Sequence, residues 1–159
     1  MGLGLRPFER RPRPAMHAYS TRPATEEDIA FLTELRLRTF RQHLISAGIV
    51  LTLDEHRRSA GANIESCSII EVADRPIGML KVLRSEDEWT VDQIQLEPEF
   101  QDKGLGTEIL RSLQRSARAA RVRLSLYVLK VNPALRLYER LGFSIVGEEE
   151  GMYAMQSEA

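Results

Sequence analysis

Residues 101–107, which read QDKGLGT, combine residue types and spacing suited to binding an anion. Gly104 and Gly106 let the backbone turn tightly without a Cβ, so successive N–H groups can converge on one ligand. A helical apolar pattern follows, and the first N–H groups of a helix have no partner within it. Because the helix dipole and Lys103 both add positive charge, the loop predicts a site for a phosphate or pyrophosphate.

This spacing excludes two familiar nucleotide loops. A P-loop ends in Gly-Lys followed by Ser or Thr, which residues 101–107 lack, and their second glycine comes too early for the dinucleotide fingerprint. Glycines also precede many helices that bind nothing. The loop alone therefore does not decide between a ligand site and an ordinary helix start.

A second motif, NPALRLYERLGF, follows one predicted strand later at residues 132–143. Together with Gln101, Gly104 and Gly106, it resembles the GNAT superfamily of N-acetyltransferases. The acetyl-CoA loop of that family has Gln or Arg, two residues, Gly, one residue, then Gly or Ala. The resemblance covers residues 89–155 firmly, and the preceding hairpin and first helix more loosely. It implies one α/β domain with a mixed, mostly antiparallel sheet of about seven strands, flanked by helices and splayed between the fourth and fifth strands.

The resemblance also implies acetyl-CoA as the donor, with no metal. The backbone of Leu96 would pair with the pantetheine arm and its N–H would polarise the thioester carbonyl, whether or not its side chain belongs to the core. Asn132 would reach the same arm, although it could equally be the cap of its helix. The implied cofactor-binding residues are Leu96, Gln101, Asp102, Lys103, Gly104, Leu105, Gly106, Thr107, Asn132, Leu135 and Tyr138.

Tyr138 is the residue that we expect to protonate the departing CoA thiolate. It follows Asn132 by about two turns, and helical spacing places it on the face away from Ala134 and Leu137. The alternative is an ordinary half-buried tyrosine packed beside Leu135, with its hydroxyl in water.

The base that takes the proton of the amine is less defined. Many relatives carry a glutamate where Gln93 stands, and an amide cannot accept that proton. Asp92 is adjacent, but strand alternation turns it to the opposite face unless a bulge shifts the register. Both remain candidates, and a water chain or an amine that arrives neutral would remove the need for either.

A polar cluster ends the first predicted helix, on the side that faces the acceptor in this family. It either shapes specificity or is a solvated face, and the same alternatives hold for His56, Arg57 and Arg58. Cys67 is expected to be a small buried hydrophobe. The cluster consists of Arg36, Thr39, Arg41, Gln42 and His43.

The elements that position these residues follow from apolar periodicity and turn residues. Thr25 is placed to cap the first helix, Pro133 to begin the last one and Gly142 to end it. The predicted strands are 18–22, 68–72, 77–82, 89–96, 122–128, 144–148 and 152–155. The predicted helices start after Thr25, at Asp54, after residues 101–107 and at Pro133.

Composition limits the remaining possibilities. The 159 residues suit one domain. With 22 Lys and Arg against 23 Asp and Glu, the chain has no excess of positive charge that would attract nucleic acid or an anionic membrane. A single cysteine cannot form an internal disulfide, which indicates a cytoplasmic protein. Residues 1–16 are rich in Arg and Pro, so we expect a disordered leader, or a true start at Met16, before a domain at 17–159. A basic arm for nucleic acid is the weaker alternative.

The sequence therefore predicts an N-acetyltransferase that moves acetyl from acetyl-CoA directly to a primary amine of a small molecule or peptide in a ternary complex. A CoA-binding sensor without catalysis is the alternative, supported by the neutral Gln93. A homodimer is the default expectation for its assembly. The acceptor does not follow from the sequence.

Overall fold

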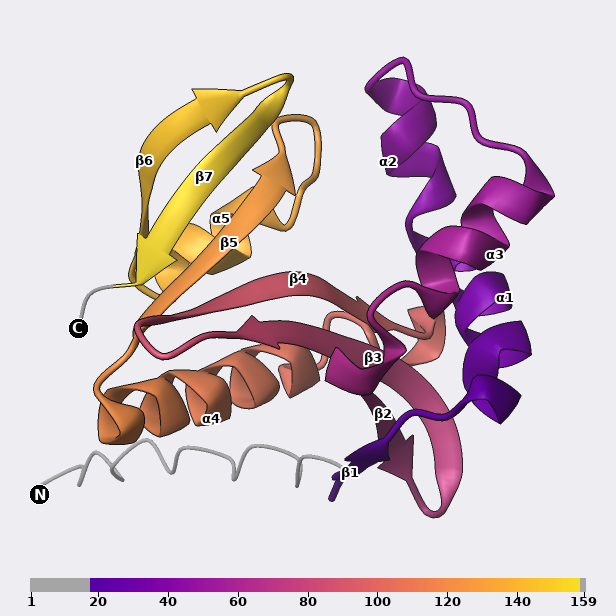
Figure 1. Cartoon of the computed structure of the whole chain (residues 1–159), viewed down its shortest axis with the longest axis horizontal. Helices are drawn as coiled ribbons and strands as arrows, with labels where there is room; N and C mark the ends of the chain where they lie inside the picture. The colour runs from indigo at the N-terminus through magenta and orange to yellow at the C-terminus, as the bar shows by residue number, and fades with distance from the viewer. Residues whose placement is uncertain (1–17, 158–159) are drawn as a thin grey trace, which may run out of the picture.

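The computed structural model describes residues 18–157 and shows one α/β domain (Figure 1). The leader predicted at residues 1–16 lies outside the described residues. The strands are β1 (Ser20–Pro23), β2 (Cys67–Val72), β3 (Arg75–Arg84), β4 (Glu88–Leu96), β5 (Arg123–Leu129), β6 (Phe143–Glu149) and β7 (Met152–Ser157). The α-helices are α1 (Ile29–Thr39), α2 (Arg41–Ser46), α3 (Leu53–Gly61), α4 (Leu105–Ala120) and α5 (Leu135–Arg140), with short 3₁₀ turns at Glu26–Asp28, Ile64–Ser66 and Pro98–Phe100.

Within residues 18–157 the strands form one seven-stranded sheet in the order β1-β2-β3-β4-β5-β7-β6. The predicted meander of β2, β3 and β4 is confirmed, because each pairs antiparallel with the next. The β4–β5 pair is parallel, and α4 makes the crossover between its two strands. A mixed sheet flanked by helices is therefore present, as the sequence predicted.

The splay between the fourth and fifth strands is also confirmed. The β4–β5 ladder runs from Glu88 paired with Arg123 to Val91 paired with Leu126, and stops there. The next residue, Asp92, is extra in the β3–β4 ladder, because Gln93 pairs with Lys81 while Val91 pairs with Val82. Such a bulge bends a strand and increases its twist. The bulge therefore lies where β4 turns away from β5.

Helices cover both faces of the sheet. Neighbouring residues of a strand point to opposite faces, and Ile69 packs with α1 and α3 whereas Ile70 packs with α4. Helix α4 buries its apolar stripe, including Ile109, Leu110 and Leu113, against this second face. In Figure 1, α4 runs beneath β3 and β4, and α1, α2 and α3 gather at the other end of the strands.

The first helix differs from its prediction, because Phe40 separates α1 from α2. The hydroxyl of Thr39 donates to the carbonyl of Leu35 at 2.8 Å, a bond that bends helices. Phe40 itself has φ −114°. The helix therefore breaks in the middle of the predicted polar cluster.

The boundaries of one helix and one strand also differ from their predicted positions. Helix α5 begins at Leu135 instead of Pro133, because the Asn132 side chain accepts the Ala134 N–H at 2.9 Å and holds this turn outside the helix. Strand β1 includes Pro23, which pairs with Ser68. Since β1 is the edge of the sheet, the missing N–H of a proline is tolerated there.

Candidate active site

A cleft of about 650 Å³ is lined by the part of β4 that has left β5, by the 101–107 loop and by α1, α2, α4 and α5. The predicted site residues that line it are Leu96, Gln101, Asp102, Gly104, Gly106, Thr107, Asn132 and Tyr138. Asp92, Gln93, Lys103, Leu105 and Leu135 are not among the described residues that line it. The side chain of Leu105 is buried beneath the loop. The cleft thus gathers residues of both sequence motifs.

The loop presents backbone N–H groups to one end of this cleft. Gly104 has φ +82°, a left-handed conformation that costs glycine nothing. The first bond of α4 runs from the N–H of Glu108 to the carbonyl of Gly104 at 3.1 Å. The N–H groups of Leu105, Gly106 and Thr107 consequently have no partner within the helix. This arrangement can bind an anion.

The backbone N–H and C=O of Leu96 face the open side of β4. The N–H of Glu97 donates to the carbonyl of Ile77 at 2.7 Å across the β3–β4 ladder. Peptide groups of successive residues in a strand point to opposite sides. The N–H and C=O of Leu96 therefore point away from β3, into the gap that β5 has left. The carbonyl accepts a bond from the Gln101 side chain at 2.9 Å.

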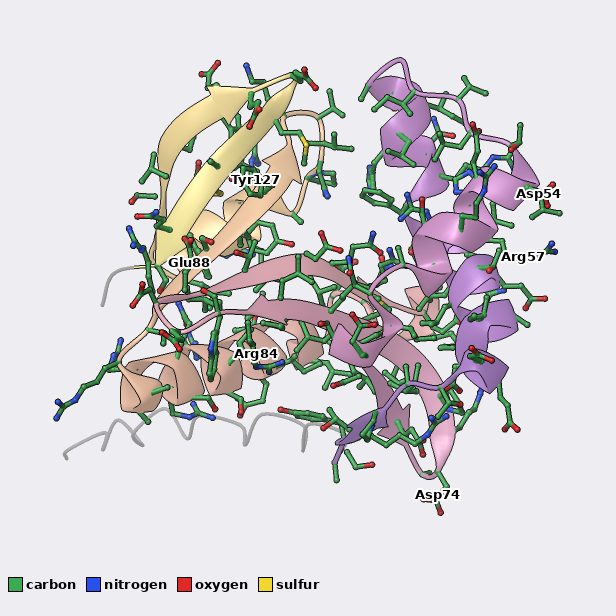
Figure 2. All side chains as sticks on the ribbon, in the orientation of Figure 1. Asp54, Arg57, Asp74, Arg84, Glu88 and Tyr127 are labelled. Atoms are coloured by element: carbon green, nitrogen blue, oxygen red, sulfur yellow. The ribbon has the colours of Figure 1, made fainter. Side chains whose placement is uncertain are left out.

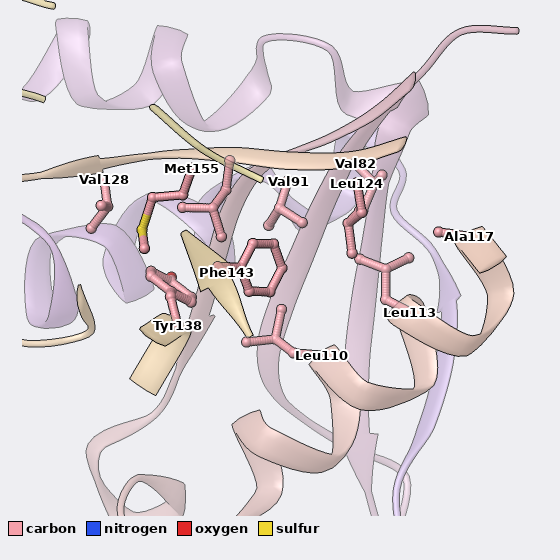
Figure 3. Close-up of a cluster of buried hydrophobic side chains, with 11 residues drawn as sticks. Val82, Val91, Leu110, Leu113, Ala117, Leu124, Val128, Tyr138, Phe143 and Met155 are labelled. Atoms are coloured by element: carbon pink, nitrogen blue, oxygen red, sulfur yellow. The ribbon is translucent and has the colours of Figure 1, made fainter. Parts of the chain in front are cut away.

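Tyr138 lies deeper than we predicted. It is 8% exposed and belongs to the core, with its ring edge-on to Phe143 at 6.1 Å between centroids (Figure 3). Ala134 and Leu137 pack against the same cluster, so the predicted opposite faces were wrong. The helix has only six residues, fewer than two turns, and it packs against core residues of the sheet. Burial raises the pKa of the phenol to about 12.

Known protein families identify the family of this chain. The model of the acetyltransferase (GNAT) domain matches residues 63–145, more than half of the chain. The chain belongs to the GNAT acetyltransferase family. No curated protein sequence matches this GNAT chain.

Solved structures share the fold of this GNAT domain. The PaiA N-acetyltransferase of Thermoplasma acidophilum, in complex with coenzyme A, is 16% identical with a TM-score of 0.72, over 89% of this chain and 99% of that one. An acetyltransferase of Thermus thermophilus is 19% identical with a TM-score of 0.70, over 89% of this chain and 96% of that one. N-acetylglutamate synthase of Neisseria gonorrhoeae, complexed with coenzyme A and N-acetyl-glutamate, is 18% identical with a TM-score of 0.65, over 88% of this chain and 35% of that one.

The two candidate bases of this GNAT domain lie beside the cleft. Gln93 accepts a hydrogen bond from the side chain of Gln95 at 3.1 Å, and Gln95 lines the cleft. Asp92 is the exposed bulge residue. The charge of Asp92 acts on Arg36 of α1, where it favours the charged guanidinium.

Sequence reasoning missed several residues of the cleft. Arg136 and Arg140 line it from α5 and add positive charge, although neither was singled out. Their position within the second motif was the available signal. Phe40, Ile94 and Gln95 also line it, and apolar or neutral side chains carry no signal that distinguishes a cleft wall from a core.

Within residues 18–157, no helix is long and apolar enough to cross a membrane. Within the same residues, no group of three or more His, Cys, Asp or Glu side chains is arranged to hold a metal ion.

Proposed function

We propose that the protein transfers the acetyl group of acetyl-CoA to a primary amine, directly and within a ternary complex. This proposal rests on two backbone features that lie along the same cleft. At one end of the cleft, the first N–H groups of α4 have no partner within the helix. Beside them, Leu96 lines the cleft from β4, with its N–H and C=O directed away from β3. An extended ligand with a pyrophosphate and an amide-containing arm would use both.

The described residues fit coenzyme A. Its pyrophosphate would accept bonds from the N–H groups of residues 105–107, with Arg136 and Arg140 supplying charge. A Cβ added at Gly106 would approach only Leu96, at 3.8 Å, so the helix start is not crowded by the protein. The amide groups of the arm would pair with the Leu96 peptide as an added strand does. When bound, acetyl-CoA supplies a thioester activated for acyl transfer.

Tyr138 is proposed to stabilise the sulfur as it leaves. With a pKa of about 12, its phenol stays protonated at neutral pH. No hydrogen bond of this hydroxyl is found in the described part of the chain, and the residue lines the cleft. An ordinary thiol has a pKa of about 8.5, so the phenol is better suited to donating a hydrogen bond to the thiolate than to complete proton transfer.

Asp92 is the stronger of the two candidate bases. The Gln93 side chain is an amide, and its oxygen is already engaged by Gln95. Asp92 lies at the bulge with an exposed side chain, and its charge acts on Arg36 of α1. A water chain from the amine to Asp92, or an amine that arrives neutral, remains compatible with this arrangement.

Direct transfer is supported by the state of the only cysteine in the chain. Cys67 is 2% exposed in β2, and burial raises the pKa of its thiol to about 11. Thiolates are the nucleophilic form, so this group is poorly suited to carry an acetyl intermediate. A single cysteine also supports the proposal of a cytoplasmic location, which cell fractionation would test.

A thiol-release assay across a panel of primary amines tests the proposal. We expect release of CoA from acetyl-CoA that depends on the amine. Tyr138→Phe should lower turnover about tenfold or more with nearly unchanged acetyl-CoA affinity. The control is Tyr127→Phe, at an exposed position of β5 (Figure 2), which should leave both turnover and affinity unchanged. Binding of acetyl-CoA without amine-dependent release would instead identify a sensor, which the neutral Gln93 favours.

A further inference from the structure

Arg36 of α1 is a buried cation with an incomplete set of partners. It is 5% exposed, and its Nε donates to Nδ1 of His56 at 3.2 Å. Its Nη1 is completely buried, and no hydrogen-bond partner for it exists among residues 18–157. Arginine is rarely buried without a partner, and a buried orphan donor is costly.

No carboxylate in residues 18–157 forms an ion pair with Arg36. The Asp92 charge favours the charged guanidinium at longer range, but burial is the larger influence and lowers the pKa of Arg36. His56 is itself buried, and burial followed by the nearby Arg36 charge lowers its pKa. His56 therefore accepts the Nε–H as a neutral imidazole and supplies no negative charge.

The guanidinium lies directly behind the wall of the cleft. Its central carbon is 4.9 Å from the ring centroid of Phe40, and Phe40 lines the cleft. Stacking occupies one face of the guanidinium and leaves its in-plane N–H groups free to bind. Among residues 18–157, Nη1 is the only nitrogen of Arg36 that is both fully buried and without a hydrogen bond. Nη2 also makes no hydrogen bond there, so it must retain some contact with solvent. The edge formed by Nη1 and Nη2 thus lacks an acceptor among residues 18–157, and it lies next to Phe40, although Arg36 itself is not among the described residues that line the cleft.

We propose that this edge of Arg36 binds a carboxylate of the acceptor, which is therefore an amino acid or a short peptide whose carboxylate lies near the reacting amine. A carboxylate matches the planar, two-donor edge of a guanidinium. The Asp92 carboxylate, whose charge acts on Arg36, would complement the ammonium of such a zwitterion at the edge of the cleft. This inference rests on the proposed acetyl transfer and specifies the acceptor.

Paired acceptors test it with the full chain. Amino acids and dipeptides are compared with their C-terminal amides, which keep the amine and lose the carboxylate charge, and polyamines extend the panel. For the best pair, we expect wild-type kcat/KM to favour the carboxylate about tenfold or more. The ratio within each pair is measured in one protein preparation, so differences in folded fraction cancel.

Variants of Arg36 then locate the source of that preference. Arg36→Met should bring the ratio to about one, because KM rises more for the carboxylate than for the amide. Arg36→Lys, which keeps the charge without the planar edge, should retain part of it. The matched control is Arg57→Met, because Arg57 is exposed on α3 and points outward beside Asp54 (Figure 2).

The outcomes separate the two proposals. Amine-dependent thiol release with equal kcat/KM for acids and amides overturns the carboxylate inference alone, and so does a preference that Arg36→Met leaves intact. If none of the amines supports release by the wild type, acetyl transfer fails and the inference fails with it. A preference lost in Arg36→Met and kept in Arg57→Met supports both.

Discussion

Gln101 donates a hydrogen bond from Nε2 to the carbonyl oxygen of Leu96 at 2.9 Å. This bond joins the first residue of the glycine loop to the last residue of β4. The loop would hold a pyrophosphate and the strand would hold the arm attached to it, so their relative position matters for one ligand. Gln101 therefore acts as a positioning residue in the proposed site.

Gln101→Met should weaken acetyl-CoA binding. The substitution keeps the length of the side chain and removes the donor to Leu96, and one neutral hydrogen bond corresponds to about a twofold to tenfold change in affinity. Titration calorimetry measures the change. Gln42→Met, at an exposed position of α2, is the control, and equal affinity of the two variants would show that the Gln101 bond does not organise the site.

Gly104 offers a test of the anion site by charge alone. Its φ of +82° is a conformation that Asn and Asp adopt more readily than other side chains. Gly104→Asn and Gly104→Asp should therefore have similar stability, whereas only the Asp variant repels a pyrophosphate. We expect the Asp variant to bind acetyl-CoA about tenfold or more weakly than the Asn variant. Acetyl-pantetheine, which has no pyrophosphate, should not discriminate between them.

Gly78 allows β3 to approach β4 beside Leu96. A Cβ at this position would lie 2.5 Å from the carbonyl oxygen of Gln95 and 2.7 Å from Cδ2 of Leu96. Gly78→Ala should displace the end of β4, with a loss of about 1–3 kcal/mol in unfolding free energy and weaker acetyl-CoA binding.

Gly147→Ala provides the control for that variant. Its Cβ would make an ordinary contact of 3.9 Å with Ala154, on strands that do not line the cleft in the described chain. Chemical denaturation and calorimetry measure both properties. If Gly78→Ala behaves like Gly147→Ala, the close approach at Leu96 is not required for the site.

The raised pKa of Tyr138 predicts a loss of stability at alkaline pH. The phenol titrates at about 12 in the folded chain and at an ordinary value of 10 when unfolded. Between these values only the unfolded chain releases the proton, so this stabilisation is complete below pH 10 and declines as the pH rises toward 12. Tyr138→Phe should remove up to about 3 kcal/mol of this pH dependence. Urea unfolding at pH 9 and pH 11 compares the variant with the wild type, and parallel declines would contradict a buried neutral phenol.

The sequence predicted the parts of the fold that depend on local pattern. Alternating apolar residues identified the strands of the meander, and the spacing of Gln101, Gly104 and Gly106 located the loop before α4. The splay was predicted through the family resemblance, and the structure adds its local cause in the bulge at Asp92. The strands of the meander and the glycine loop depend on residues close together in the chain, whereas the splay does not.

Features that depend on distant contacts were not predicted correctly. Tyr138 was expected on the helix face away from Ala134 and Leu137, but it is buried in the same cluster, through contacts with Phe143 and with strands that pack over α5. Arg36 was placed in a polar cluster with His43, yet it is covered by α3 and bonded to His56. Helical spacing identifies neighbours on one helix and contains no information on what another element covers.

The most direct test of the central claim is to follow an isotope-labelled acetyl group from acetyl-CoA by mass spectrometry, with the wild-type chain and the paired amines. We predict that the label appears in an amide of the amine, in proportion to the thiol released, and that no acetylated protein accumulates when the amine is omitted. Label that stays on CoA, or that is found only as acetate, would contradict acetyl transfer by this domain.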